Sequence, residues 1–560
     1  MHLIPLRSLI LIGALLCSVL PLPVRSAAAS PMQEYVDAMH PGWNLGNSLD
    51  AMPGETSWGN PPVTRKLIRQ IAAEGFRSIR IPVTWTHHTG AAPGYTVDPA
   101  WMARVQQIVD WSLEAGLYVM INVHHDSRNW TNTMPANRTA VLARYRALWT
   151  QIAARFRDRS ERLTFESINE PAFDGVDEAT QLALLDELNV LFVHLVRGSG
   201  GANATRPLVL TTLKAGGDQP YLDSLNATFA RLADPNLIAT IHYYGYWPFS
   251  VNVAGTTTFD AKAIADLTTH VDAACAAFVA RGIPVIIGEY GLLCFDKDDT
   301  GSAVERGEML KFFELYTHYA REKKFAHMWW DNGQHFDRAT CRWRDPELFG
   351  VVKQSLTGRT STAATDLIFL PRGVAASDVT LDLNLNGNTF VALDDGATPL
   401  VAGTDYTLDG SQLTIKAGAL SRHARGAYGE KTVLTARFSA GSPWKIRVRH
   451  VAPPELRSAK LSRGGALKIP VAFNGDLLAT IEAVYTTGGN AGPNDFTPFK
   501  EYGAAFTCDY AKGTVAITKK FFDATTAGKA IDFTFHFRSG RTVKYQFSGS
   551  RAAVVGDAAK

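Results

Sequence analysis

The sequence predicts a protein of the α/β class: a (β/α)8 TIM barrel followed by two all-β, sandwich-like domains. A cassette of amphipathic helix, glycine and short apolar strand recurs through the first part of the chain, and about eight such strands can be counted. Tryptophan usage marks where this pattern ends, because eleven of the twelve tryptophans precede residue 350 and only Trp444 follows. The length of 560 residues also exceeds what one hydrophobic core usually serves, so several domains are expected.

The barrel prediction depends on where helices end and strands begin. Gly75, Gly116 and Gly282 each stand between a helical run and an apolar run, where a left-handed residue ends a helix. Asp98 and Pro99 are typical of the start of a helix. A doubly wound open sheet is the alternative, but no glycine-rich phosphate-binding turn follows the first strand. The strands are expected to begin near Gly42, Phe76, Leu117, Leu163, Pro207, Leu237, Pro284 and Phe325.

The last third of the chain has the two-residue period of β-strands. The run VTLDLNLNG from Val379 places apolar residues at odd positions, so one face is expected to be buried. Asp409 and Gly410 mark a hairpin between two further strands. The segment TGRTSTAAT (357–365) is interpreted as a linker, and Pro453-Pro454 as a stiff second boundary. The expected domains are a signal peptide (1–29), the barrel (31–356) and two β-sandwiches (364–452 and 455–552).

The N-terminus predicts export. Arg7 precedes an apolar stretch (8–20) and a run of small residues (26–29), which is the order found in a secretory signal peptide. A lipoprotein anchored through Cys17 is the alternative, although Leu16 before it fits that pattern poorly. We therefore expect a secreted monomer, extracellular or periplasmic, with no membrane attachment after signal cleavage. A net charge of +3 gives no reason to expect nucleic acid as a partner.

Two glutamates carry the strongest functional signal. Glu170 closes the run LTFESINE and Glu289 closes the run IPVIIGE. Each therefore stands at the C-terminal end of a predicted strand, where barrel enzymes keep their catalytic residues. Two converging carboxyl groups are the minimal machinery for hydrolysing a glycosidic bond. The alternative is that each glutamate belongs to a structural ion pair.

Other predicted strands also end in polar or aromatic residues, which favours one shared site over core packing. Arg80 lies inside an apolar strand and therefore needs an acidic partner. No His-x-x-x-His spacing occurs among the histidines, and glycoside hydrolysis needs no metal, so no metal or cofactor is expected. Cys294 and Cys341 follow two of the strands and either bridge two loops or stay unpaired. The strand-end residues are Arg80, His124, His125, Asn169, His242, Tyr244 and Trp330.

These motifs resemble glycoside hydrolase family 5, in particular subfamily 4 with its endo-β-1,4-glucanases and xyloglucanases. The resemblance covers residues 31 to about 356 through GWNLGNSLDA, ETSWGNP, SIRIPVTW, INVHHD, INEP, IHYYGYWPF, IIGEYG and WWDNG. The next domain resembles the immunoglobulin-like X2 module of such enzymes, and the last resembles a carbohydrate-binding module of family 46. The resemblance implies a retaining endo-β-1,4-glucanase acting on cellulose, xyloglucan or mixed-linkage β-glucan.

The resemblance also implies a role for individual residues. Glu170 matches the acid/base and Glu289 the nucleophile, with their carboxyl groups about 5–5.5 Å apart. Arg80 and Tyr244 would hold Glu289 ionised, and the charge of Glu289 would keep Glu170 protonated. The remaining matches are to sugar contacts: Asn169 to the 2-hydroxyl, His124, His125 and His242 to the sugar and carboxylates, and Trp330, preferred over Trp329, to the −1 sugar.

Tryptophans near the loops that follow the barrel strands are candidate platforms for stacking sugars. Trp43, Trp85 and Trp247 are expected to contribute to the cleft, with Trp58 and Trp130 as further candidates. The last domain has no tryptophan after residue 453, which departs from the usual aromatic binding platform; we expect this domain to fold back beside the cleft and extend it. The alternatives are a β-mannanase or lichenase of the same fold, or a non-catalytic polysaccharide-binding or adhesion protein.

Overall fold

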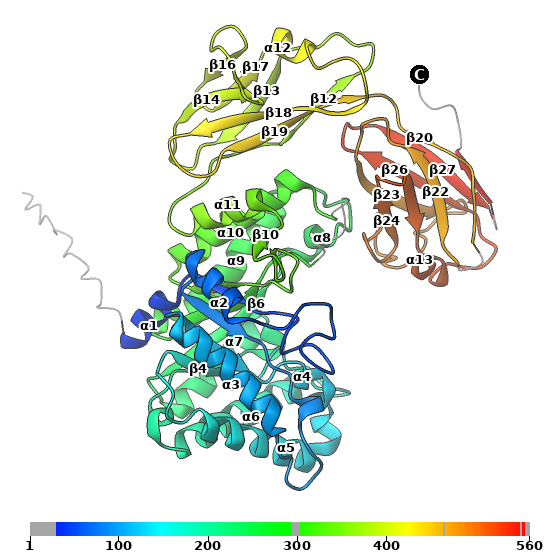
Figure 1. Cartoon of the computed structure of the whole chain (residues 1–560). Coiled ribbons are helices and arrows are strands. Elements are labelled where there is room, and N and C mark those ends of the chain that lie inside the picture. Colours follow the sequence, from blue (N-terminus) through cyan, green and yellow to red (C-terminus); the bar gives the residue numbers. More distant parts are fainter. Residues whose placement is uncertain (1–29, 294–302, 463–464, 549–550, 555–560) are drawn as a thin grey trace, which may run out of the picture.

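The computed structural model describes residues 30–293, 303–462, 465–548 and 551–554. Eight parallel strands close into a barrel in the order β1 to β8 (Figure 1). Each begins within two residues of its expected position, so the barrel prediction is confirmed. The strands are β1 (Gly42–Asn44), β2 (Ser78–Ile81), β3 (Tyr118–Asn122), β4 (Leu163–Glu166), β5 (Leu208–Thr211), β6 (Leu237–Tyr243), β7 (Val285–Tyr290) and β8 (Ala326–Trp329).

Helices cover the outside of the barrel, and local sequence explains their ends. Asp98 caps α3 by accepting a hydrogen bond from the backbone N–H of Ala100, and Pro99 follows it as predicted. Gly75 and Gly116 have φ angles of +105° and +83°, the left-handed conformation expected after α2 and α3. The helices are α1 (Pro31–Met39), α2 (Arg65–Ala73), α3 (Pro99–Glu114), α4 (Asp126–Asn129), α5 (Met134–Arg155), α6 (Glu178–Gly198), α7 (Gln219–Leu232), α8 (Trp247–Ser250), α9 (Ala261–Ala277), α10 (Arg306–Glu322) and α11 (Pro346–Ser355).

Two of these segments, α6 and Ala261–Arg281, are long and apolar enough to cross a membrane by composition alone. Their buried residues, such as Leu188 and Val271, belong to the core that surrounds the barrel. A small ribbon, β9 (Phe336–Asp337) and β10 (Arg342–Trp343), follows β8. Cys341 lies in the turn of this ribbon. Whether it forms a disulfide with Cys294 or stays unpaired involves residue 294, which lies outside the described residues.

Two sheets form the first β domain, as the alternating pattern predicted. Leu381 and Leu383 are buried on β13 between exposed neighbours, and Asp409 and Gly410 turn the chain between β16 and β17. One sheet has the order β11 (Thr362–Ala363), β13 (Val379–Asn384), β17 (Gln412–Ile415), β16 (Tyr406–Asp409). The other has the order β12 (Leu367–Pro371), β19 (Trp444–Val451), β18 (Gly429–Phe438), β14 (Phe390–Asp395), β15 (Thr398–Pro399), and α12 (Ala417–Ser421) connects the two.

The interpretation of residues 357–365 as a linker is wrong. Strand β11 lies within this segment and pairs with β13. Arg359 donates to Glu314 of α10 at 2.7 Å, and Thr360 and Ser361 are buried. Because serine, threonine and glycine also occur in short edge strands, composition alone did not distinguish the two cases. The first β domain is therefore fixed against the barrel.

Two further sheets form the last domain. One sheet has the order β20 (Glu455–Leu456), β22 (Leu467–Ala472), β25 (Thr514–Ile517), β24 (Phe506–Asp509). The other has the order β21 (Ala459–Lys460), β28 (Arg551–Val554), β27 (Thr542–Ser548), β26 (Ile531–Phe537), β23 (Leu478–Tyr485). The short helix α13 (Lys519–Asp523) follows β25. Its core is a separate cluster, in which Phe506, Phe533 and Phe535 are buried.

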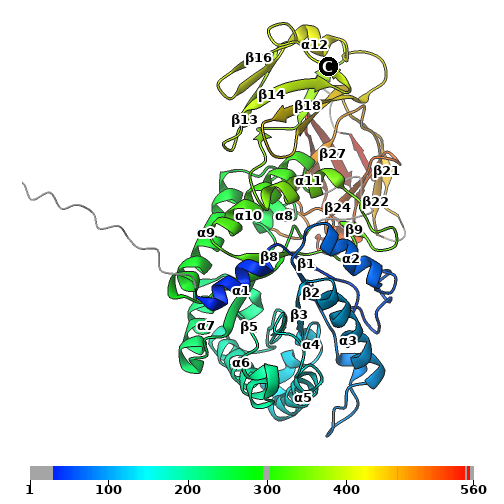
Figure 2. The same cartoon turned by 60° about the vertical axis from the view of Figure 1, so that its left-hand side comes forward.

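The two β domains meet the barrel in different places. The first lies over α10 and α11, while the last lies to one side near α8 (Figures 1 and 2). Arg447 of β19 pairs with Glu347 of α11 at 3.0 Å. The last domain instead contacts the loop after β6, where the backbone N–H of Tyr502 donates to the carbonyl of Val251 at 3.2 Å. The chain therefore folds back so that its last domain contacts a loop at the C-terminal end of the barrel strands.

Candidate active site

The polar residues predicted at the strand ends gather at the C-terminal end of the barrel. Glu289 lies on β7, and the pairing register with both neighbouring strands shifts at Gly288. A side chain at position 288 would lie 2.9 Å from Nε2 of His242, so glycine is needed where the two strands approach. A β-bulge of this kind re-aims the adjacent side chain. The bulge thereby brings Glu289 level with His242.

The carboxylate of Glu289 is enclosed by donors from other strands. Nη1 of Arg80 lies 2.6 Å from Oε1, and the Tyr244 hydroxyl donates to Oε2 at 2.6 Å. Nδ1 of His242 lies 3.6 Å from Oε2. The Glu289 side chain is only 5% exposed. Two close donors, one of them charged, hold the carboxyl group of Glu289 in one orientation.

Arg80 has two acidic partners, one of which sequence reasoning missed. Its Nε and Nη2 donate to Glu166 of β4 at 2.8 and 3.0 Å, and both side chains are fully buried. Nη2 also donates to Oδ1 of Asn169 at 2.8 Å. Although burial opposes the charge, Glu166 and Glu289 together raise the pKa of Arg80 above its ordinary value. The signal for Glu166 was available, because a glutamate that follows directly on an apolar run and is buried needs a cation as partner.

Glu170 lies in a different setting. It comes four residues after the end of β4, in a loop, and has a left-handed φ of +39° that is uncommon outside glycine and asparagine. Its Oε1 lies 3.1 Å from Nδ1 of His242, and its Oε2 accepts from Nη2 of Arg128 at 2.7 Å. The Arg128 side chain is 69% exposed. Arg128, which follows the INVHHD motif, was not predicted to belong to the site.

The partners of Glu170 in this arrangement act on its pKa in one direction. Burial raises its pKa, but hydrogen bonding to His242 and the charges of His242, Arg128 and Arg80 outweigh burial and lower the pKa to about 2. The carboxylates of Glu289 and Glu170 in turn raise the pKa of His242, although burial opposes this. Arg128 and His242 both contact Glu170 directly, and both contacts favour its carboxylate form.

His124 and Trp330 lie together beside the carboxylates. Their rings are stacked with centroids 6.1 Å apart, and Nδ1 of His124 lies 3.1 Å from the Asn122 amide. Burial and neighbouring cations lower the pKa of His124 well below its ordinary value, so this ring is neutral. Trp329 is fully buried in the core, which favours Trp330 as the ring that faces the site. His125 lies further out, with Nε2 3.7 Å from Asp50.

The prediction for the tryptophans is only partly correct. Trp43 and Trp85 are fully buried, and their indole N–H groups donate to Asp331 at 3.0 Å and to the carbonyl of Asn122 at 3.0 Å. They support the site from within the core and are not free to stack on a sugar. Trp247 and Trp58 remain open, with 41% and 39% of their surface exposed. Trp130 is buried.

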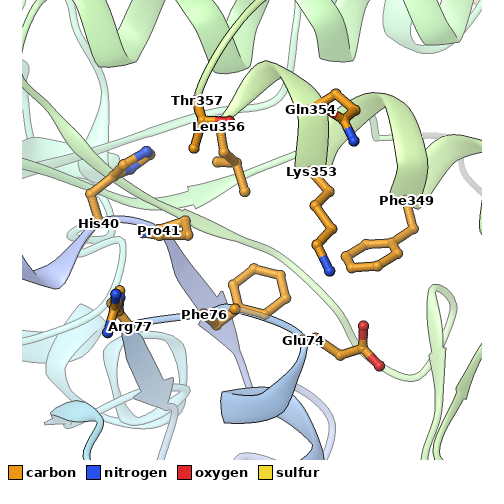
Figure 3. A pocket seen from close by; sticks show the side chains of 11 residues that line it. His40, Pro41, Glu74, Phe76, Arg77, Phe349, Lys353, Gln354, Leu356 and Thr357 are labelled. Atoms are coloured by element: carbon orange, nitrogen blue, oxygen red, sulfur yellow. The ribbon is translucent and has the colours of Figure 1, made fainter. Parts of the chain in front are cut away.

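A cavity that lies away from these residues does not share their chemistry. It measures about 450 Å³ and is lined by His40, Phe76, Phe349 and Lys353 (Figure 3). His40 and Phe76 come just before β1 and β2, so the cavity lies at the opposite end of the barrel from the two glutamates.

The geometry at the C-terminal end is that of a bond-cleaving site for sugars. Oxygens of Glu170 and Glu289 and a nitrogen of His242 all lie within 4.8 Å of one another. One carboxylate is enclosed and the other is more open to the cleft, and a neutral histidine stacks with a tryptophan beside them. Fold and site together define a glycoside hydrolase of the (β/α)8 class.

Residues 44–336 match the family model for cellulase (glycosyl hydrolase family 5), and the chain belongs to this family. Residues 363–448 match carbohydrate binding domain X2, and residues 453–557 match carbohydrate binding domain CBM46. The chain is 50% identical to endoglucanase B of Paenibacillus lautus over 98% of both chains. The comparisons thus bear out the resemblance drawn from the motifs, and the chain is an endoglucanase.

Solved structures with all three domains agree with this assignment. The tri-modular endo-β-1,4-glucanase B of Bacillus halodurans has a TM-score of 0.91 at 46% identity, covering 95% of this chain and all of that one. A tri-modular subfamily 4 endo-β-1,4-glucanase of Bacillus licheniformis, solved with cellotetraose, has a TM-score of 0.80 at 33% identity. The match covers 94% of this chain and 98% of that one.

Proposed function

We propose that the chain hydrolyses internal β-1,4-glucosidic bonds with retention, using Glu289 as nucleophile and Glu170 as acid/base. The observation that carries this assignment is the spacing of the pair, whose carboxyl oxygens approach within 4.8 Å. Retaining glycosidases hold their two carboxyl groups about 5–5.5 Å apart, whereas inverting enzymes leave about 6.5–9.5 Å for a water molecule. The close donors that orient Glu289 support its role as the nucleophile.

Each step then follows from the residues in place. In the first, Oε of Glu289 attacks the anomeric carbon while Glu170 gives its proton to the departing glycosidic oxygen, which leaves an ester to Glu289. In the second, ionised Glu170 takes a proton from water, the water oxygen attacks the anomeric carbon, and Glu289 leaves as carboxylate. Arg80 and Tyr244 stabilise Glu289 before attack and after release.

The other predicted residues would hold the sugar. Asn169 is fixed by Arg80 beside the pair, where an amide can bind the 2-hydroxyl. Neutral His124 can accept or donate a hydrogen bond to a hydroxyl, and the face of Trp330 can pack on the −1 sugar. His242 contacts Glu170 and lies near Glu289, so its role would be to orient and charge-balance the pair.

The last domain would extend the cleft through one exposed aromatic side chain. Phe496 is 64% exposed and its ring lies 6.3 Å from that of Trp247. Trp247 follows Tyr244 by three residues, and Tyr244 contacts Glu289. Trp247 and Phe496 therefore lie next to the segment that contacts the nucleophile. Two exposed rings side by side offer a surface for further sugar units.

A buried lysine fixes the loop that carries Phe496. Lys500 is 1% exposed, and its Nζ donates to the carbonyl oxygens of Pro493, Asn494 and Thr497 at 3.2, 3.3 and 2.8 Å. Burial lowers the pKa of this ammonium to about 8. The loop therefore has a defined shape while Lys500 is charged.

Reducing-sugar release from carboxymethyl-cellulose, xyloglucan, mixed-linkage glucan and mannan tests the substrate. We expect turnover of the first three and none of mannan; mannan as the best substrate would identify a β-mannanase, and no turnover of any would favour a binding or adhesion protein. A chain ending at residue 452 should lose activity on branched and polymeric glucans more than on short oligosaccharides. Equal losses on both would contradict a role for the last domain in the cleft.

Export and oligomeric state are also proposed, from the N-terminal pattern of Arg7, the apolar stretch and the small residues. The mature chain would begin after residue 29 and act outside the cytoplasm as a monomer. N-terminal sequencing of the protein from culture medium and periplasm, with light scattering for its mass, tests both. An intact N-terminus on an active protein would contradict signal cleavage.

A further inference from the structure

Both oxygens of the acid/base are already occupied in the free protein. Oε1 of Glu170 lies 3.1 Å from His242, and Oε2 accepts from Arg128 at 2.7 Å. A general acid must bring its proton within hydrogen-bond reach of the leaving oxygen, at about 2.6–3.2 Å. Each oxygen keeps a second lone-pair site, but a partner that gives way when a glucan binds would leave the carboxyl group free to turn toward the leaving oxygen.

Burial and anchoring decide which partner moves. The His242 side chain is 4% exposed, lies on β6 and also faces Glu289, so it has no room to leave. The Arg128 side chain is 69% exposed and extends from α4, a helix of one turn. Within the described part of the chain, its guanidinium donates to no side chain other than Glu170.

We propose that Arg128 is a positioning residue that responds to the leaving group: it pairs with Glu170 while the leaving-group side of the cleft is empty and is displaced when sugar occupies that side. This inference rests on the proposed role of Glu170 as acid/base. A displaced Arg128 removes a positive charge from Glu170, so Glu170 can hold the proton that the first step transfers to the glycosidic oxygen. Departure of the leaving group lets Arg128 return.

The returning arginine then supports the opposite charge state. After the first step Glu170 is a carboxylate, and the second step needs it as the base that takes a proton from water. An ion pair with Arg128 favours that carboxylate. The other groups that face Glu170 are His242 from β6, Arg80 from β2, Tyr244 after β6 and, within 4.8 Å, Glu289 from β7. They stay in place, and of these Glu289 loses its charge in the ester and regains it when the ester is hydrolysed. Arg128 is thus the mobile charge of the site.

The test compares Arg128→Gln, which removes the charge, with Arg128→Lys, which keeps it. For a soluble glucan, the basic limb of the pH profile of kcat/KM reports the pKa of Glu170 in the free enzyme. In R128Q this limb should move to higher pH, by roughly one pH unit or more, because a positive charge has been removed. For an aryl cellobioside with an activated leaving group, where the second step limits turnover, the acidic limb of kcat should move up as well. R128K should keep both limbs near their original positions.

Limbs that do not move in R128Q would overturn the inference, as would an equal shift in R128K. Glu170→Ala separates this outcome from failure of the proposed function. If E170A loses activity on glucan but azide restores turnover of the activated cellobioside, Glu170 is the acid/base and only the role of Arg128 is in question. If E170A hydrolyses glucan normally, the proposed function itself fails.

Discussion

The two halves of the active site are built differently although they carry the same chemical group. Glu289 lies on a strand, is 5% exposed, and takes its partners from β2 and the end of β6. Glu170 lies on a loop with a left-handed backbone, is 23% exposed, and has one partner on the surface of a one-turn helix. A nucleophile must be a carboxylate before each attack, whereas an acid/base changes its charge twice per turnover. With the roles proposed above, the rigid half holds the nucleophile and the open half holds the group that gives and takes the proton.

Removal of each carboxylate should separate the two halves most strongly. Glu289→Ala removes the nucleophile, so activity on every substrate should fall by about 10^4-fold or more. Glu170→Ala should cost about 10^2–10^4-fold on glucan, and much less on an aryl cellobioside whose leaving group needs no proton. Initial rates on both substrates measure the difference. Equal losses on the activated substrate would contradict the assignment of the two roles.

The buried support of the rigid half predicts the next largest effect. Glu166→Gln leaves Arg80 with one anionic partner in a fully buried site, and breaking such a pair costs about 3–5 kcal/mol of unfolding free energy. Urea unfolding followed by tryptophan fluorescence reports on the barrel, which contains eleven of the twelve tryptophans. The exposed Glu161→Gln at the start of the same segment is the matched control and should change little. An unfolding free energy like that of the control would show that Glu166 is dispensable.

The pair of Glu170 and His242 should make stability depend on pH within a defined window. The folded pKa of Glu170 lies below its ordinary 4.5, so its contribution is present above that value and is lost as pH falls toward about 2. The folded pKa of His242 lies above its ordinary 6.5, so its contribution is present below 6.5 and is lost as pH rises through the raised value. The Tm of wild type should exceed that of His242→Gln most between 4.5 and 6.5, by about 2–4 °C.

Differential scanning calorimetry across pH 3 to about 9 measures this window. His87→Gln, an exposed histidine, serves as the control and should give a Tm difference that is flat with pH. A constant difference for His242→Gln as well would mean that the pair contributes packing only.

The smallest effect is expected furthest from the two carboxylates. Phe496→Ala removes one exposed ring, which is worth about 0.5–1.5 kcal/mol in stacking, or roughly 2–10-fold in kcat/KM on long glucans. Short oligosaccharides should be hydrolysed as before. Val374→Ala, an equally exposed apolar residue on the first β domain, provides the control. A loss on short oligosaccharides as large as on polymers would contradict a role for Phe496 in distant sugar contacts.

More of the rigid half of the site than of the open half could be predicted from the sequence. Strand periodicity located all eight barrel strands, and a charged residue in an apolar strand correctly indicated that Arg80 has an acidic partner. Arg128 could not be found in this way, because an exposed arginine in a one-turn helix looks like any other surface residue. Trp43 and Trp85 were misplaced because loop position does not tell which way a ring points. The β11 segment was missed because a Ser/Thr-rich edge strand and a linker share one composition.

Lys500 holds the loop of residues 493–500 in the last domain by a positive charge that belongs to the chain. Three carbonyl oxygens around one positive charge are what a protein offers to a dissolved metal ion, and here the charge is covalently attached to the chain. Unlike a bound ion, this charge cannot be lost to a chelator or to dilution. Burial lowers the pKa of the ammonium to about 8, so alkaline pH weakens its hold on the three carbonyl oxygens. In media of variable mineral content, Lys500 would thus serve in this loop as a structural ion does in other proteins.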